Sequence, residues 1–293
     1  MDTFRHIFRM IRFWFTTRAG REQELCAAAR KGDADEVCFL LSCGVRVDGG
    51  DATGVIALQH AAEAGSRKVM ELLLVGGARV DAKGFRGWQA LHYAARDGHR
   101  SVVELLIEKG AKVDAADEDG CQPLHIAADH GKREMIELLV EKGAQVGAVD
   151  NEGRQPLHHA ATGGEREAVE ALIGLGAQVD AEDRRGEQPL HFAASRRMTL
   201  HKGSSLEITA MPFMKEHGAV ISLLLAHEAD PAAVSKAGKT PRDLCHDEEN
   251  SKLLEKAEQG WQPLRDGRRC KDLTEHLKRQ RKLGSLRPKG PSL

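Results

Sequence analysis

The chain has 293 residues and a formal net charge of −1 at pH 7, and aromatic residues make up only 4% of it. This aromatic content is low for a globular enzyme, in which ring side chains fill much of the core. No apolar run approaches the length of a transmembrane helix, and no small-residue cleavage site follows the N-terminal segment. We therefore expect neither a membrane span nor secretion.

Residues 1–21 form the first predicted element, a basic amphipathic segment with a net charge of +4. At about 100° per residue, its apolar side chains share one face and its arginines share the other. Three interpretations remain open: attachment of residues 1–18 to a membrane surface or a mitochondrial presequence, a helix that caps the repeats, and a partner-binding helix. The candidate membrane contacts are Phe4, Phe8, Ile11, Trp14 and Phe15.

A block of 33 residues then recurs four times without a gap from Asp51 to Glu182. The apolar residues of each block have helical spacing, which predicts two short helices per unit. The polar segment between units ends in glycine and predicts a β-turn finger, and the fixed period predicts a solenoid. Glycines that favour helix ends follow the first helix (Gly65, Gly98, Gly131, Gly164) and the second helix (Gly77, Gly110, Gly143, Gly176) of each unit.

These blocks resemble the ankyrin repeat. The segments CQPLHIAADHG, RQPLHHAATGG and EQPLHFAAS match the family's Thr-Pro-Leu-His motif, paired alanines and glycine, with glutamine in place of threonine. The resemblance covers residues 22–257 and implies an all-α repeat solenoid of stacked helix-turn-helix units with β-turn fingers. It also implies protein partners and no cofactor.

The array is predicted to contain about seven units, the last of them a terminal cap. The sixth unit is longer than the others because it has an apolar, methionine-rich insertion near residues 196–215, which suits an adaptable binding surface or a loop folded over the last units. The predicted boundaries are 22–50, 51–83, 84–116, 117–149, 150–182, 183–234 and 235–257.

Residues 258–293 form the last predicted element, a basic and flexible tail with a net charge of +6, whereas the array between the two basic ends carries −11. The stretch LKRQRK in the tail resembles a nuclear-localisation or nucleic-acid patch. A solvated tail that folds against the acidic array is the alternative, and it is the one we favour. We expect no nucleic-acid partner.

No motif in the chain predicts catalysis or a bound metal. The six cysteines lack paired CxxC spacing, which predicts free thiols in a reducing compartment. We find no glycine-rich phosphate loop, HExxH motif or nucleophile signature, so we expect no enzyme activity, no cofactor and no small-molecule substrate. One histidine recurs at the same position of each unit, where the resemblance implies a structural hydrogen bond between neighbouring fingers: His92, His125, His158 and His191.

The residues that vary most between similar units are the ones free to contact a partner, on the concave surface of fingers and first helices. Trp88 is the predicted anchor, and local packing on Phe85 or the next finger is the alternative. The finger candidates are Phe85, Arg86, Trp88, Glu118, Asp119, Asn151, Glu152, Arg154, Arg184 and Arg185. The first-helix candidates are Arg96, Asp97, Asp129, His130 and Thr162.

The sequence thus predicts a non-catalytic scaffold or adaptor that binds a protein partner through this surface, in the cytoplasm. One alternative is a membrane- or organelle-associated adaptor that uses the N-terminal helix, at a peripheral membrane or in mitochondria. The other is a soluble inhibitor of an enzyme or of a transcription factor, with nuclear entry through the basic tail.

Overall fold

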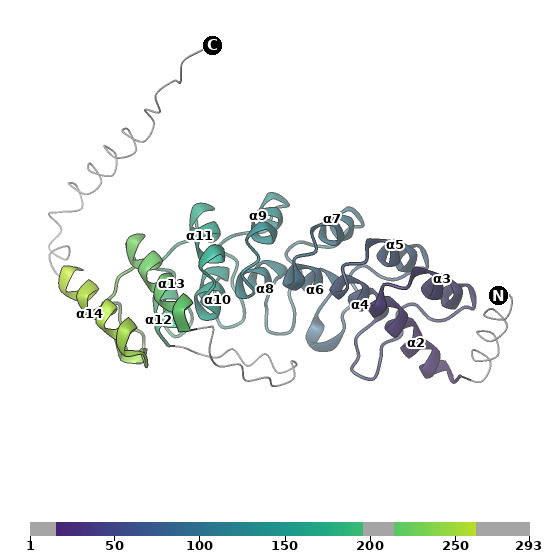
Figure 1. The fold of residues 1–293 in the computed structure, drawn as a ribbon, viewed down its shortest axis with the longest axis horizontal. Coiled ribbons are helices and arrows are strands. Elements are labelled where there is room, and N and C mark those ends of the chain that lie inside the picture. Colours follow the sequence, from purple (N-terminus) through teal and green to yellow (C-terminus); the bar gives the residue numbers. More distant parts are fainter. Residues whose placement is uncertain (1–15, 196–213, 262–293) are drawn as a thin grey trace, which may run out of the picture.

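The computed structural model describes residues 16–195 and 214–261, and these ranges contain helices and no β-strand. Figure 1 shows an elongated stack in which most helices lie in two rows. The inner row comprises α2 (Arg18–Lys31), α4 (Ala57–Glu63), α6 (Ala90–Asp97), α8 (Pro123–Asp129), α10 (Pro156–Gly163) and α12 (Pro189–Ser195). The outer row comprises α3 (Ala34–Ser42), α5 (Arg67–Val75), α7 (Arg100–Glu108), α9 (Arg133–Glu141) and α11 (Arg166–Gly174).

The C-terminal end of the stack differs from the regular units. Helix α13 (Met214–Ala226) packs against α11 and α12, and α14 (Glu248–Trp261) packs against α13. Two short 3₁₀ helices, η1 (Phe85–Gly87) and η2 (Arg242–Leu244), lie in the segments between helices. The predicted fold class, an all-α stack of paired helices, is confirmed. The predicted membrane contacts, most of the insertion and most of the basic tail lie outside the described residues.

Glycine is required where the chain turns from an inner to an outer helix. Gly98 closes α6 in the left-handed conformation, with φ of 82°, and its N–H donates to the carbonyl of Ala94 at 3.0 Å. At Gly65 φ is 66°, and an added Cβ would lie 2.6 Å from the imidazole of His99. Backbone conformation and close packing therefore both demand glycine at this predicted turn.

The core lies between the two rows and is made mainly of leucine and alanine. Alanines on the inner helices let neighbouring helices approach closely, as Ala94 and Ala95 do where α6 packs between α4 and α8. Leucines from both rows fill the remaining space and are fully buried, among them Leu91, Leu106, Leu124, Leu139 and Leu157. No described helix is long and apolar enough to cross a lipid bilayer.

In four of the units, a buried imidazole on the inner helix links the unit to the next finger. The Nδ1 atom of His92 accepts from the backbone N–H of Gln89 at 3.1 Å, and its Nε2 atom donates to the carbonyl of Cys121 at 3.2 Å. The same pair of hydrogen bonds recurs at His125, His158 and His191. The predicted structural role of these histidines is confirmed, and the bonding pattern requires the neutral, Nε2-protonated ring.

Glutamine replaces the imidazole in one unit. Gln59 accepts from the N–H of Ile56 at 3.1 Å through Oε1, and its Nε2 donates to the carbonyl of Trp88 at 2.7 Å. An amide therefore makes both bonds of the histidine at this position.

Burial sets the protonation state of the histidine links. It lowers the pKa of His125 to about 3, with a further contribution from the nearby His159, and it lowers the pKa of His158 to about 4. Protonation would also turn Nδ1 into a donor that faces a backbone N–H donor. The unfolded chain, whose histidines titrate near 6.5, therefore takes up protons in mild acid before the folded chain does.

We predict that the free energy of unfolding falls as the pH drops from about 6.5 toward about 4, and that His125 and His158 each contribute about 1.4 kcal/mol per pH unit to this fall. His125→Gln, which copies Gln59, should keep the fold and remove one histidine's share, about 2 kcal/mol between pH 7.5 and pH 5. Urea unfolding at both pH values measures this difference. His227→Gln, at an exposed position, is the control. The prediction would be wrong if His125→Gln lost as much unfolding free energy between pH 7.5 and pH 5 as the unmodified chain.

Candidate functional site

The fingers are built around aspartate and joined by backbone hydrogen bonds. Asp117 accepts from the N–H groups of Asp119 at 2.9 Å and of Cys121 at 2.8 Å through Oδ1, which closes its finger. Between fingers, the N–H of Glu118 donates to the carbonyl of Arg86 at 3.1 Å, and that of Asn151 donates to the carbonyl of Asp119 at 2.9 Å. The fingers therefore form one continuous edge of the stack rather than separate loops.

The second oxygen of the finger aspartate receives a different partner in different units. For Asp117 the partner is Trp88 on the preceding finger, whose Nε1–H donates to Oδ2 at 3.0 Å. For Asp51 it is His60, whose Nε2 lies 2.8 Å from Oδ2. Trp88, the predicted anchor, therefore also braces two fingers. Its role in binding a partner stays a prediction.

Aromatic side chains are concentrated in one unit. Three of the six aromatic residues in the described ranges are Phe85, Trp88 and Tyr93, and together with Arg96 we call them the aromatic surface. The Trp88 and Tyr93 rings meet edge to face, with centroids 5.0 Å apart, and the Arg96 guanidinium lies 5.4 Å from the centre of the Tyr93 ring. Phe85 is 50% exposed, so it offers an apolar side chain to a partner.

Arg96 is held in place by two acids. Its guanidinium lies 2.8 Å from Glu63 on α4 and 2.9 Å from Asp97 at the end of α6. Burial alone would lower the pKa of Arg96, but the hydrogen bonds to Asp97 and Glu63 outweigh it and raise that pKa. The guanidinium is therefore positioned in advance beside Tyr93.

The predicted finger arginines pair with acids of the array. Arg86 binds Asp119 on the next finger, and Arg185 lies 3.7 Å from Glu152 on the preceding one. Arg154 is bonded to Asp150 of its own finger at 2.8 Å. The structure thus joins Arg86 to Asp119 and Arg185 to Glu152, which are all predicted candidates. The candidates Glu118 and Arg184 are exposed.

The candidates on the later inner helices are less accessible. Asp129 is buried at the end of α8, and the Thr162 hydroxyl donates to the carbonyl of His158 at 2.8 Å within α10. His130 is half-buried and hydrogen-bonded to the carbonyl of Ile126 at 3.1 Å. Asp129 and His130 end α8, the inner helix next to α6, which carries Tyr93 and Arg96 of the aromatic surface.

A buried thiol, carboxylate and imidazole meet under the fingers of two units. Asp150 Oδ2 accepts from His159 Nε2 at 3.0 Å and from Arg154 Nε at 2.8 Å, and Cys121 Sγ lies 4.0 Å away. The sequence gives no signal for this cluster, because its members are 29 and 9 residues apart and only stacking brings Cys121 to the other two.

The Cys121 thiol in this cluster is not an activated nucleophile. Its neighbour His159 is bonded to Asp150, and burial, followed by the charges of Asp117 and Asp150, raises the pKa of Cys121. The carboxyl group of Asp150 stays ionised. Burial raises its pKa, but the hydrogen bonds from His159 and Arg154 outweigh burial and lower the pKa below its usual value. The metal-free thiol is therefore unreactive, whereas the cluster brings together sulfur, oxygen and nitrogen atoms of the kinds that bind metals.

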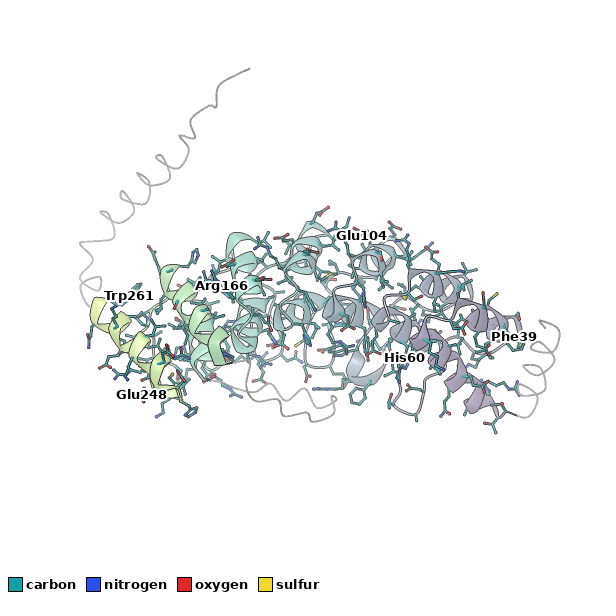
Figure 2. The ribbon with its side chains drawn as sticks, in the orientation of Figure 1. Phe39, His60, Glu104, Arg166, Glu248 and Trp261 are labelled. Atoms are coloured by element: carbon teal, nitrogen blue, oxygen red, sulfur yellow. The ribbon has the colours of Figure 1, made fainter. Side chains whose placement is uncertain are left out.

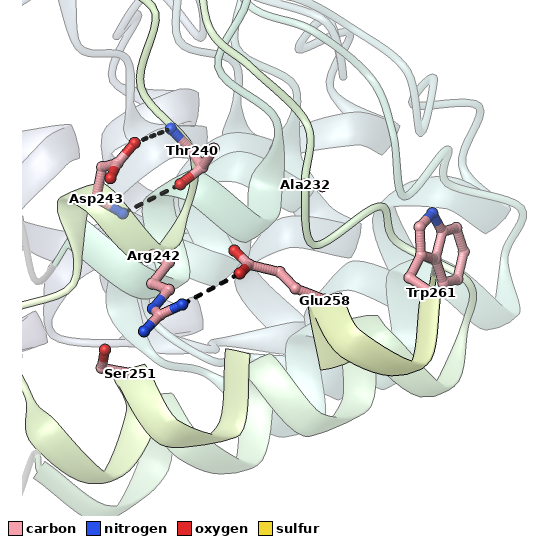
Figure 3. Close-up of a pocket in the computed structure, with 7 residues that line it drawn as sticks. All are labelled: Ala232, Thr240, Arg242, Asp243, Ser251, Glu258 and Trp261. Carbon is pink, nitrogen blue, oxygen red and sulfur yellow. Dashed lines mark hydrogen bonds and ion pairs between the residues drawn. The ribbon is translucent and has the colours of Figure 1, made fainter. Parts of the chain in front are cut away.

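A cavity of about 570 Å³ lies at the C-terminal end of the stack, beside α14 (Figure 3). The backbone N–H of Thr240 donates to the Asp243 carboxylate at 2.9 Å, and the backbone N–H of Asp243 donates to the Thr240 hydroxyl at 3.2 Å. Arg242 is paired with Glu258 at 3.4 Å. The Thr240–Asp243 bonds cap η2, and the Arg242–Glu258 pair joins η2 to α14. The lining residues are Ala232, Thr240, Arg242, Asp243, Ser251, Glu258 and Trp261.

The stacked helix pairs and linked fingers define a repeat protein with an extended recognition surface. Comparison with known proteins agrees, because residues 25–117, 73–150 and 124–202 match the family model for ankyrin repeats in three copies. The crystal structure of the human ASB11 ankyrin repeat domain is similar, with a TM-score of 0.65 and 27% identity over 80% of this chain and 96% of that one. No curated protein matches the sequence. The chain belongs to the ankyrin-repeat family.

Two substitutions separate the stabilising role of the Trp88–Asp117 hydrogen bond from the contribution of the half-exposed Phe85 ring. Trp88→Phe keeps an aromatic ring against Tyr93 but removes the hydrogen bond to Asp117, so we predict a loss of about 1 kcal/mol in the free energy of unfolding. Phe85→Ala at a half-exposed position should change that free energy by less than about 0.5 kcal/mol. Urea denaturation of both variants tests this, and equal effects would show that the Trp88–Asp117 bond does not brace the fingers.

Proposed function

We propose that this protein is a non-catalytic adaptor that binds a protein partner through the concave surface of its fingers and inner helices, centred on the aromatic surface. Ankyrin repeats are generally protein-binding modules, and the family is typically non-catalytic. Fold membership does not choose the binding residues, so the assignment of this surface rests on the local chemistry of the chain.

The concentration of aromatic residues is the observation that carries the proposal. Tryptophan, tyrosine and arginine dominate binding hot spots because they bury a large area and also form polar contacts. Trp88, Tyr93 and Arg96 lie together on one unit of an array whose other layers are packed mainly by leucine and alanine. The half-exposed ring of Phe85 extends this surface along the finger.

Preorganisation supports the same surface. Trp88 is fixed by Asp117 and Tyr93, and Arg96 is fixed by Glu63 and Asp97. A partner that contacts them therefore loses little side-chain entropy, which favours affinity.

The outer row is a weaker candidate because helices α5, α7, α9 and α11 carry ion pairs within each helix and no aromatic side chain. Arg100 binds Glu104 at 2.9 Å on α7, and Arg166 binds Glu170 at 2.9 Å on α11. Figure 2 shows Glu104 and Arg166 along this row, with His60 nearer the fingers. Arg67 with Glu71 on α5 and Arg133 with Glu137 on α9 repeat the pattern.

The cytoplasm remains the compartment that we propose. The cysteines of the described residues are free thiols, which suits a reducing compartment. The addresses suggested by residues 1–18 and by the basic tail remain alternatives to be tested by localisation of the full chain.

We predict that a partner captured from cell lysate by the full chain binds the Phe85→Ala and Trp88→Ala variants at least about 30-fold more weakly, as expected for a hot spot worth about 2 kcal/mol. The captured protein should be identified by mass spectrometry, purified, and titrated against each variant by calorimetry.

Val75→Ala is the matched control for these titrations, because Val75 is 88% exposed at the end of the outer helix α5. It should bind like the unmodified chain. Unchanged affinity of folded Phe85→Ala and Trp88→Ala proteins would exclude the aromatic surface as the binding site and direct the search to the remaining fingers.

A further inference from the structure

The cluster of Cys121, Asp150 and His159 places three metal-ligand atoms together inside the array. Each residue offers one atom, and the three atoms lie within 4.8 Å of one another. All three residues are buried, and they come from the finger of one unit and from the finger and inner helix of the next.

The donor set and the spacing suit zinc. Thiolate, imidazole and carboxylate are the three protein ligand types that Zn²⁺ accepts. Tetrahedral coordination with usual bond lengths puts the oxygen about 3.3 Å from the nitrogen and about 3.6 Å from the sulfur. The corresponding distances here are 3.0 Å and 4.0 Å, close to these values, and the sulfur and nitrogen atoms lie within 4.8 Å of each other.

The charges around the thiol favour a bound cation. Cys121 lies beside the carboxylates of Asp117 and Asp150, and its own backbone N–H donates to Asp117 at 2.8 Å. The Arg154 guanidinium now occupies part of this anionic region, 2.8 Å from Asp150. Its side chain is 28% exposed, so it can swing into solvent and leave an entry path and a fourth position for water.

A second aspartate–histidine pair in the chain lacks the thiol that completes the cluster. Asp51 and His60 repeat the bond of Asp150 and His159, at 2.8 Å, and Arg30 contacts both residues of that pair. The buried thiol nearest in sequence, Cys26, instead faces the carbonyls of Gly49 and Val55 at 3.7 Å and 3.6 Å. Among the described residues, the complete three-ligand group occurs at Cys121, Asp150 and His159.

We propose that Cys121, Asp150 and His159 bind a Zn²⁺ ion that joins the units of residues 117–149 and 150–182. Binding displaces Arg154 from Asp150, moves the ring proton of His159 from Nε2 to Nδ1, so that Nε2 can bind the metal, and releases the thiol proton of Cys121 to solvent. The ligands converge only in the stacked array, so the metal stabilises the folded chain over the unfolded one. This inference is independent of the aromatic surface and of its partner.

Cobalt(II) is the first probe, because it takes zinc sites and reports thiolate ligation by a charge-transfer band in the near ultraviolet. The full chain, reduced and stripped with a chelator, is titrated with cobalt and then with zinc. We expect a band that saturates at one cobalt per chain, disappears when zinc is added, and is accompanied by a higher unfolding temperature. Absence of the band in the folded chain would overturn the proposal.

Cys121→Val is the decisive variant, because Val55 occupies the equivalent position of an earlier unit and the fold accepts it there. It should lose the band and bind zinc at least about tenfold more weakly, since even loss of a second-shell partner costs about that much. Cys38→Ser, at an exposed position on α3, is the matched control and should keep the band. A band that survives Cys121→Val and is lost in Cys270→Ser would assign the metal to the C-terminal tail and overturn the proposal.

Arg154→Ala distinguishes a metal site from a structural cluster. Removing this arginine deletes an ion pair of the metal-free protein, so a purely structural role predicts lower stability and no change in metal affinity. A zinc site predicts tighter cobalt and zinc binding, because the cation that competes for Asp150 is gone. Unchanged or weaker metal binding by folded Arg154→Ala would contradict the proposed displacement.

Discussion

The hydrogen bond from a buried inner-helix side chain to the next finger is the interaction on which the rest of the structure depends. A solenoid has no central core, so each unit must be held in register by its neighbours. His92 does this by bonding its own helix start with Nδ1 and the carbonyl of Cys121 with Nε2. The bond fixes finger against finger, and the contacts between fingers follow from that register.

The repeated backbone geometry places different side chains at equivalent positions of successive units. Trp88, Cys121 and Arg154 occupy the same finger position in successive units, yet they do different things. Trp88 braces Asp117, Cys121 lies near Asp150, and Arg154 binds the aspartate of its own finger. One position therefore contributes to the proposed recognition surface in one unit and to the proposed metal site in another.

The two proposed sites draw on this repeated geometry differently. In the aromatic surface, Phe85, Trp88 and Arg96 remain partly open to solvent, which suits contact with another protein, whereas Tyr93 is buried and supports Trp88 and Arg96 from below. The cluster of Cys121, Asp150 and His159 is enclosed, and its burial suits an ion that needs no contact with a partner. The two sites meet at Asp117, which accepts from the Trp88 indole and from the backbone N–H of Cys121.

The amino-acid sequence alone determined the repeat, the paired helices and the glycine turns, because these features are local or recur at a fixed period. The structural role of the recurring histidines followed from the resemblance to ankyrin repeats. It singled out Trp88 as exceptional but left open what the indole touches. Stacking alone decided that Trp88 meets Asp117, that Arg86 meets Asp119, and that Cys121 meets Asp150. These pairs join separate units, and their distances depend on how far each unit is rotated and shifted against the next, which the helical period of one unit does not contain.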